Sequence, residues 1–365
     1  MLGARFQIQN SGSRLHFYLF KLHRIGGVAA GLLLLILGVS GSVMAFSDEI
    51  DCLLHPSLFK VVPEGQPLSL SQLASSAASA LHAGESIGTC VPTTRADATY
   101  SFIVFGTHHR IPRQIFVDQY TGRVVGSLSA VRFTSIMKAL HIVAGGLGCS
   151  SIILVFLVLS GLYLWWPRKQ IKIGLSGNVQ RLSFDLHNCI GLFASLFLFL
   201  FAVTGIYMVF GPPAYAITSK PVKQPAFSTP QVGLKPVSLD LVATAAKHVL
   251  PGATVLWIVI PRQPREAYFV KMRFPEDRSD NGSSAVWIDQ FSGKVLTVAN
   301  SRAVPLENKL QTMSRVIHTG DVFGNGGRAF AAFMSLILVL QTVTGLLLWW
   351  NRRRRKLPRA AASQP

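Results

Sequence analysis

Charge is scarce in this chain, and acidic residues are scarcer than basic ones. Only 14% of the 365 residues are charged, whereas 50% are hydrophobic, and the mean hydropathy is +0.40. Soluble domains carry about 25% charged residues, so this composition excludes an ordinary soluble protein and predicts an integral membrane protein.

The four cysteines are uninformative in number. Cys52 and Cys90 lie in the same polar stretch and could form a disulfide in an oxidising compartment. Cys149 and Cys189 lie in apolar stretches, where we expect inert packing residues.

Acidic residues are absent from three basic segments. Residues 1–24, 167–181 and 351–365 contain 14 of the 35 Lys and Arg residues and none of the 16 acids. A net charge of +19 by itself suggests nucleic-acid binding. Basic segments that flank apolar stretches are, however, typical of the cytoplasmic side of a membrane protein. We therefore expect no nucleic-acid partner and expect both chain termini in the cytoplasm.

Charged residues are also absent between His141 and Trp166. About 20 apolar residues are needed to cross roughly 30 Å of hydrocarbon, and this stretch is long enough. Inside lipid the backbone can bond only to itself, so we predict a transmembrane helix. Ionisable groups at membrane depth are costly, and His141 is therefore a candidate functional residue.

The same pattern occurs four times, which predicts four transmembrane helices. A Leu-His or Ile-His pair begins each stretch: Leu22-His23, Leu140-His141, Leu186-His187 and Ile317-His318. A Ser-Gly or Thr-Gly pair lies near each end: Ser40-Gly41, Ser160-Gly161, Thr204-Gly205 and Thr344-Gly345. The basic lead before the first stretch is long for a signal peptide, so we expect an uncleaved anchor.

The two long polar segments also repeat each other. The first has a predicted helix at 68–82, followed by alternating strand patterns at 100–107 and 113–129. The second has a predicted helix at 239–250, followed by alternating strand patterns at 254–260, 266–274 and 284–300. The turn Val-Asp-Gln-Tyr-Thr-Gly-Arg-Val at 117–124 matches Ile-Asp-Gln-Phe-Ser-Gly-Lys-Val at 288–295. Residues 14–166 and 181–350 are therefore two copies of one plan, and an even number of spans gives both copies the same polarity.

The predicted fold is a mainly α membrane protein with a four-transmembrane-helix bundle, two extracytoplasmic α+β modules and an internal duplication. We expect transmembrane helices at 14–46, 141–166, 182–210 and 318–350. The extracytoplasmic modules are predicted at 47–140 and 211–317. The cytoplasmic parts are then an N-terminal segment at 1–13, a loop at 167–181 and a basic tail at 351–365.

The repeat decides which histidines can share a ligand. His23 and His187 both begin outward-going helices and are expected near the cytoplasmic face, whereas His141 and His318 begin inward-going helices and are expected near the outer face. Histidines within one copy are then about 30 Å apart, so only the symmetry-related pairs can meet. His318 stands further before its Thr-Gly pair than His141 does, and we expect it on a short element above its span.

Two facing imidazoles with no Cys, Asp or Glu at matching positions make a poor zinc or calcium site. They suit the two axial positions of haem b in a helix bundle, so we predict two haems, with His23/His187 and His141/His318 as ligands of the haem iron. Small residues nearby would let a flat ring approach the backbone: Gly26, Gly27, Gly145, Gly146, Gly191 and Gly320. Four bases could pair with haem propionates: Arg24, Lys138, Arg181 and Arg328. The alternative is four interfacial histidines with no ligand.

The Leu-His and Ser/Thr-Gly spans, their terminal Trp pairs and the Val-Asp-Gln-Tyr-Thr-Gly-Arg turn together resemble the PepSY-associated transmembrane helix family over nearly the whole chain. That family includes inner-membrane reductases of ferric siderophores. The resemblance implies two PepSY-like modules, bound haem b, a location in the bacterial inner membrane, and electron transfer to a periplasmic ferric siderophore.

On that hypothesis, electrons pass from a cytoplasmic reductant or a quinol through the two histidine pairs to the ferric siderophore, which releases its iron as Fe(II). An external donor is needed, because Gly324 to Gly327 follows no predicted strand and is not a dinucleotide loop. His108 and His109, beside Arg110 and Arg113, could contact an anionic ligand or simply be exposed. Two other functions remain open: a haem-free PepSY binding or regulatory membrane protein, and an electron-transfer subunit of another oxidoreductase.

Overall fold

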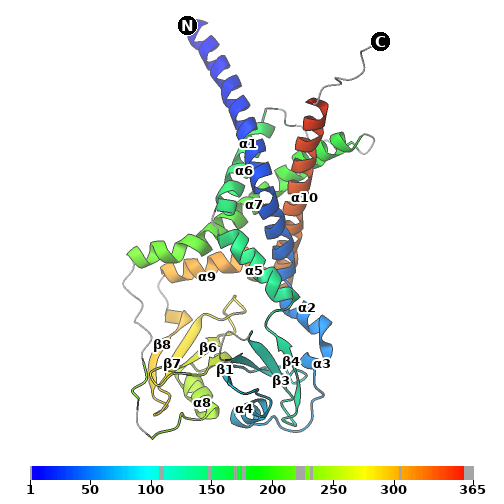
Figure 1. Cartoon of the computed structure of the whole chain (residues 1–365). Helices are drawn as coiled ribbons and strands as arrows, with labels where there is room; N and C mark the ends of the chain where they lie inside the picture. The colour runs from blue at the N-terminus through cyan, green and yellow to red at the C-terminus, as the bar shows by residue number, and fades with distance from the viewer. Residues whose placement is uncertain are drawn as a thin grey trace. The chain divides into compact units, whose positions relative to one another are not determined.

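The computed structural model describes residues 2–106, 111–146, 149–167, 169, 171, 173–174, 178–218, 227–230, 233–303 and 306–356. They form two compact units, each built from both copies of the repeat (Figure 1). The helical unit contains Met1–Ala45, Met137–Tyr215 and Ile317–Pro365. The sheet unit contains Phe46–Ile136 and Ala216–Val316.

Three long helices of the helical unit are apolar enough to cross a membrane, so this is a multi-pass membrane protein. They are α1 (Leu2–Met44), α7 (Val179–Thr218) and α10 (Gly324–Lys356). Within the described chain, the segments that pass for length and hydropathy are Arg14–Met44, Val179–Gly211 and Asp321–Arg354, the last of which includes the short 3-10 turn η2 (Asp321–Phe323).

The stretch expected as one helix from His141 to Trp166 is divided in two. Helix α5 (Phe133–Gly146) and helix α6 (Cys149–Trp165) lie at 68° to each other, and together they count as a fourth span only if this bent pair crosses as one. The Ser150 hydroxyl donates to the Ala144 carbonyl at 2.8 Å and so satisfies a carbonyl at the end of α5. His141 therefore lies on α5, before the bend.

His318 also lies on a helix of its own, α9 (Leu306–Thr319), as its longer spacing predicted. Gly320 ends this helix with a φ of +84°, a conformation that favours glycine. A Cβ at Gly320 would also lie 2.2 Å from the Gly327 carbonyl oxygen, so only glycine fits this corner between α9 and α10.

In the helical unit α1 packs along both α10 and α6. Four leucines of its core occupy equivalent positions in the two copies: Leu34 and Leu198 follow a histidine by eleven residues, and Leu154 and Leu338 precede a glycine by seven. All four are buried, with exposed fractions of 3–8%. They form a symmetric apolar layer in the interior of the unit.

The sheet unit contains one antiparallel sheet of eight strands in the order β4-β3-β2-β1-β5-β6-β7-β8. The first copy contributes β1 (Glu85–Val91), β2 (Tyr100–Gly106), β3 (Arg113–Val117) and β4 (Val124–Ser129). The second contributes β5 (Thr254–Val259), β6 (Tyr268–Arg273), β7 (Ser284–Ile288) and β8 (Val295–Ala299). The two modules therefore join through β1 and β5, where Thr89 pairs with Val259 and Cys90 with Ile258.

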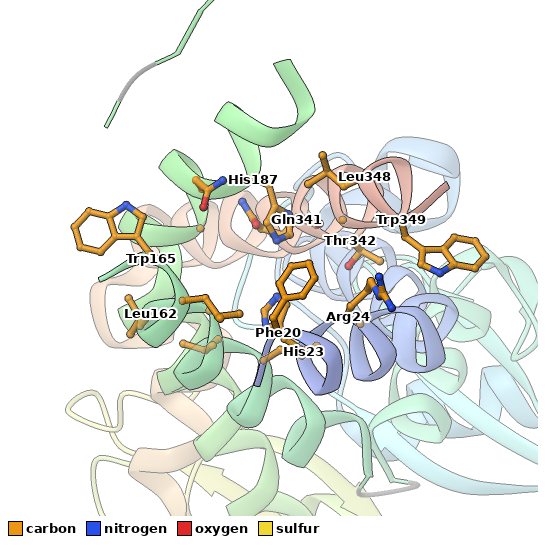
Figure 2. Close-up of a pocket in the computed structure, with 18 of the residues that line it drawn as sticks. Phe20, His23, Arg24, Leu162, Trp165, His187, Gln341, Thr342, Leu348 and Trp349 are labelled. Atoms are coloured by element: carbon orange, nitrogen blue, oxygen red, sulfur yellow. Dashed lines mark hydrogen bonds between the residues drawn. The ribbon is translucent and has the colours of Figure 1, made fainter. Parts of the chain in front are cut away.

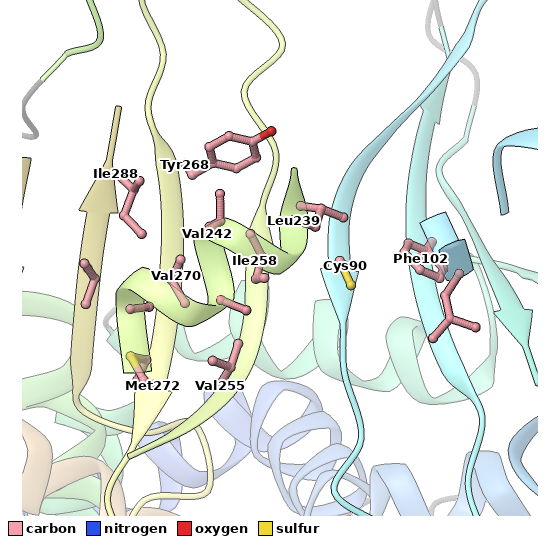
Figure 3. Close-up of a cluster of buried hydrophobic side chains, with 14 of the residues drawn as sticks. Cys90, Phe102, Leu239, Val242, Val255, Ile258, Tyr268, Val270, Met272 and Ile288 are labelled. Atoms are coloured by element: carbon pink, nitrogen blue, oxygen red, sulfur yellow. The ribbon is translucent and has the colours of Figure 1, made fainter. Parts of the chain in front are cut away.

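Helices α4 (Leu70–Ser79) and α8 (Leu239–Val249) cover one face of this sheet, and the largest hydrophobic core lies beneath them (Figure 3). Cys90, Phe102, Val242 and Met272 are each fully buried there. The remaining short elements are α2 (Ser47–Leu54), α3 (Pro56–Phe59) and the 3-10 turn η1 (Ser301–Ala303).

The shared turn motif has the same structural role in both modules. The Gln119 side chain donates to the carbonyls of residues 95, 96 and 98 at 2.7–3.0 Å, and the Gln290 side chain donates to those of residues 263, 264 and 266 at 2.7–3.1 Å. Register shifts also fall at matching places, between Phe116 and Val117 and between Trp287 and Ile288. The motif therefore fixes a loop beside each turn and supports the internal duplication.

Candidate functional site

The structure brings the four leading histidines together in two pairs within the helical unit. His23 on α1 faces His187 on α7, with ring centres 6.4 Å apart and ring planes at 83° (Figure 2). His141 on α5 faces His318 on α9, with ring centres 6.3 Å apart and ring planes at 66°. These are the symmetry-related pairs that the repeat predicted would meet.

The spacing within each pair is that of two imidazoles on one metal ion. A metal–nitrogen bond is about 2 Å long and a ring nitrogen lies about 1.1 Å from the ring centre, so rings that bind one ion from opposite sides have centres about 6.2 Å apart. Both observed separations agree with this value. The steep inclination of the planes is also that of an edge-to-face contact between the two rings, so the spacing fits a metal site without requiring one.

A hydroxyl from a neighbouring helix contacts the Nδ1 atom of every histidine. The four contacts are His23 to Ser160 at 2.8 Å, His141 to Ser40 at 3.1 Å, His187 to Thr344 at 3.0 Å and His318 to Thr204 at 3.0 Å. These hydroxyl residues are 1–6% exposed, so the contacts are shielded from water.

The direction of the hydroxyl hydrogen bonds shows which ring nitrogen of each histidine carries the proton. Each hydroxyl donates to the carbonyl four residues before it: Ser160 to Phe156, Ser40 to Ile36, Thr204 to Leu200 and Thr344 to Leu340. The hydroxyl oxygen therefore accepts from Nδ1–H. Backbone carbonyls of Gln341 and Phe201 accept from the same atom of His187 and His318 at 3.1 Å. Nε2 is then the unprotonated nitrogen of each ring, and an unprotonated ring nitrogen can bind a metal.

The glycine beside each hydroxyl lets the ring lie against the helix backbone. A Cβ added at Gly41, Gly161, Gly205 or Gly345 would lie 3.2–3.4 Å from Cε1 of His141, His23, His318 or His187, respectively. Contacts this short require the ring to move. The Ser-Gly and Thr-Gly pairs therefore position the histidines, a role that sequence reasoning missed although it noted the repeat.

A cavity of about 530 Å³ surrounds the pair His23/His187. Its walls come from α1, α6, α7 and α10 and are mostly apolar, and they include the four leucines of the symmetric layer. Gly27 and Gly191, both predicted near a flat ligand, line it. His16, seven residues before His23 on α1, also lines it. A volume of 300–1,000 Å³ is typical of a site for a small organic molecule.

The four bases that could pair with propionates have different surroundings. Arg24 lines the cavity, whereas Arg181 pairs with Asp185 at 3.1 Å and Lys138 is exposed. Arg328 donates to the carbonyl of Ala45 at 2.8 Å. Arg352, which the sequence analysis placed in the basic tail, also lines the cavity.

Other candidate residues do not join this site. Arg113 is bound to Glu85 in the sheet unit at 2.7 Å, and His108, His109 and Arg110 lie outside the described residues. Cys52 and Cys90 are both free thiols, so the disulfide that seemed possible from the sequence is not formed. Burial raises the pKa of Cys90 to about 12, which keeps this thiol neutral.

Over the described part of the chain, no three His, Cys, Asp or Glu side chains converge on one point. Each histidine pair thus offers at most two nitrogens to a metal, so a metal at either pair would need its remaining ligands from elsewhere.

Comparison with known proteins agrees with this architecture. A comparison with curated proteins finds no match. The family described as the PepSY-associated TM region matches residues 20–352, which include all four histidines and both modules of the sheet. The chain therefore belongs to the PepSY-associated TM region family.

Proposed function

We propose that this protein is a di-haem b reductase of the bacterial inner membrane that passes electrons to a periplasmic ferric siderophore. The observation that carries the proposal is that the four leading histidines form two facing pairs, each with its ring centres at the separation expected for two imidazoles on one metal ion. The resemblance to ferric-siderophore reductases of the same family supplies the substrate.

The residues present fit haem b. The two histidines of each pair would hold the haem iron, and the apolar cavity beside His23/His187, with glycines in its wall, would receive the flat macrocycle. When bound, haem b supplies reversible one-electron chemistry at its iron. The serine and threonine hydroxyls fix the orientation of each ring and keep its Nε2 available.

The two pairs lie beside opposite ends of α1 and α7, because His23 and His187 are near the starts of these helices and Ser40 and Thr204, near their ends, contact His141 and His318. Ser40, which holds His141, follows His23 by seventeen residues on α1, a distance of about 26 Å at 1.5 Å per residue. This is close to the thickness of the hydrocarbon core, about 30 Å. The bases in 14–24 and 352–356 favour a cytoplasmic location for the His23/His187 end and a periplasmic location for the His141/His318 end.

Between the pairs the chain excludes water. The buried leucines at positions 34, 154, 198 and 338 lie between the pairs along their helices. This apolar layer separates the two histidine pairs.

The proposed reaction is a one-electron reduction of iron. A cytoplasmic reductant or a quinol gives up the electron, the chelated Fe(III) accepts it, and the product is Fe(II). Hard oxygen ligands hold Fe(II) less tightly than Fe(III), so the chelate releases its iron. The sheet unit, on the periplasmic side in this proposal, supplies the surface that meets the chelate.

The test uses the full chain purified in detergent and reduced with a stoichiometric amount of dithionite. Anaerobic mixing with a ferric siderophore should restore the oxidised haem spectrum, and a ferrous chelator should trap about one Fe(II) per electron. The gallium complex of the same siderophore has similar shape and charge but cannot accept the electron, so it should leave the protein reduced.

Two results contradict the proposal. A protein that contains no haem points to the binding or regulatory role. A reduced haem protein that no ferric chelate oxidises, but that a partner enzyme does, is an electron-transfer subunit.

A further inference from the structure

The cavity beside His23/His187 is polarised along its length. Leucines 34, 154, 198 and 338 line one end. At the other end lie Arg24 on α1 and Arg352 on α10, together with His16 and the aromatic side chains of residues 17, 20, 165 and 349. An amphiphile with a charged edge fits such a cavity in one direction only.

The two guanidinium groups meet around one aromatic ring. The Arg24 guanidinium carbon lies 5.8 Å from the centre of the Phe20 ring, and that of Arg352 lies 5.0 Å from it. Both distances are within the range of a cation–π contact. Phe20 therefore contacts both guanidinium groups, whose carbons lie no more than about 11 Å apart on the cavity wall, and Figure 2 shows Arg24 beside Phe20.

This positive charge is not balanced by an acid of the cavity. Of the residues that line it, none is Asp or Glu. The acid closest in sequence to His187, Asp185, already accepts from Arg181 at 3.1 Å and from the Gly174 backbone N–H at 3.1 Å. Two guanidiniums at the edge of an apolar cavity make a site for a ligand with two negative groups, because each can form a bidentate pair with a carboxylate.

We infer that Arg24 and Arg352 form a dicarboxylate-binding site that fixes the direction in which haem b enters the cavity of His23/His187. The inference rests on the proposed function and deepens it. It assigns a ligand to Arg352, a residue of the tail that otherwise serves membrane orientation, and it makes the tail part of the cofactor site.

Comparison of the two copies of the repeat shows that the positive charge lies on one side of the cavity. Asn188 occupies the position equivalent to Arg24, directly after the leading histidine of its copy, and it also lines the cavity. Its amide donates to the Phe184 carbonyl at 2.7 Å. The carboxylates are therefore drawn to the side of α1 and α10, and the cofactor breaks the symmetry of the two copies.

The test compares two ligands in the full chain with His141→Ala, so that only the site of His23 and His187 is loaded. The chain is prepared without haem and titrated with protohaem or with its dimethyl ester, which lacks both negative charges. The parent should bind protohaem about tenfold or more tighter than the ester, since each charge-assisted pair is worth at least about a factor of ten. The double variant Arg24→Gln/Arg352→Gln should bind the two ligands alike.

Matched variants separate charge from folding. Arg353→Gln removes the next base on the same helix, which lies over the Trp349 ring rather than in the cavity wall, and should keep the preference. Arg352→Lys keeps the positive charge without the bidentate guanidinium and should keep part of the preference for protohaem over the ester. The reduction potential of the bound haem should also fall in the double variant, because two nearby cations no longer favour the reduced form.

The outcomes distinguish this inference from the proposed function. If the parent binds no protohaem, both fail. If it binds protohaem but shows no preference over the ester, or if the double variant keeps the parent's preference and potential, the carboxylate site alone is wrong.

Discussion

Each candidate ligand histidine is held by a residue pair from another helix. In both copies the first helix supplies the hydroxyl and glycine for the histidine of the second, and the second supplies those for the first. The signal was present in the sequence as the repeated Ser-Gly or Thr-Gly pair. Antiparallel neighbours place the tail of one helix beside the head of the next, so this pairing could have been predicted from the repeat.

Gly345→Ala tests this arrangement at one residue. Its Cβ would lie 3.2 Å from Cε1 of His187, so the ring must shift by a few tenths of an ångström from the place where it would bind a metal. We expect the variant to lose most of one of two haems, as measured by the pyridine haemochrome of the purified protein. Gly326→Ala is the control on the same helix, because a Cβ there meets nothing within 4 Å. Equal haem content in both variants would refute a tight fit at Gly345.

At the scale of elements, an ion pair ties the start of β1 to the start of β3 across β2. The Glu85 carboxylate accepts from Arg113 at 2.7 and 3.1 Å, and the two side chains are only 7% and 16% exposed. Hydrogen bonds from Arg113 lower the pKa of Glu85 from 4.5 to about 2. The ionised carboxylate therefore stabilises the folded sheet unit above about pH 4.5, and this stabilisation is lost as the pH falls toward 2.

Glu85→Gln should consequently lower the local stability of β1 and β3 by about 2 kcal/mol near pH 7, and by less than half as much near pH 3. Hydrogen exchange of the full chain, corrected for the intrinsic exchange rate at each pH, measures this difference. Glu64→Gln changes an exposed acid and should have little effect at either pH. A difference for Glu85→Gln that does not depend on pH would contradict the ionic origin of the stabilisation.

Helices and strands with strong sequence patterns were predicted correctly, and those with weak patterns were missed. The alternating strands on both sides of the Asp-Gln turns and helices α4 and α8 are confirmed. Strand β1 was missed because Glu-Ser-Ile-Gly-Thr-Cys-Val does not alternate clearly, although Cys90 and its neighbours pair the two modules. The bend between α5 and α6 was missed because hydropathy reports the length of an apolar stretch and not its direction.

At the scale of the whole molecule, the internal duplication predicted more of the arrangement of residues than any single motif did. It predicted which histidines would meet, and the ring separations of 6.4 and 6.3 Å follow that pairing. It could not predict that the modules share one sheet, because the β1–β5 contact joins different copies. Nor could it place Arg352 in the cavity, since a base after a span is expected to face the cytoplasm for reasons of orientation alone.

The central claim is that two histidine pairs each hold one haem, and haem content per chain in paired histidine variants tests it most directly. Wild type should contain two haems. His23→Ala, His187→Ala and the double variant of this pair should each contain one, and so should the corresponding variants of His141 and His318. His23→Ala combined with His141→Ala should contain none. Haem content that is unchanged in all single variants, or a His23/His187 double variant with no haem, would contradict the assignment.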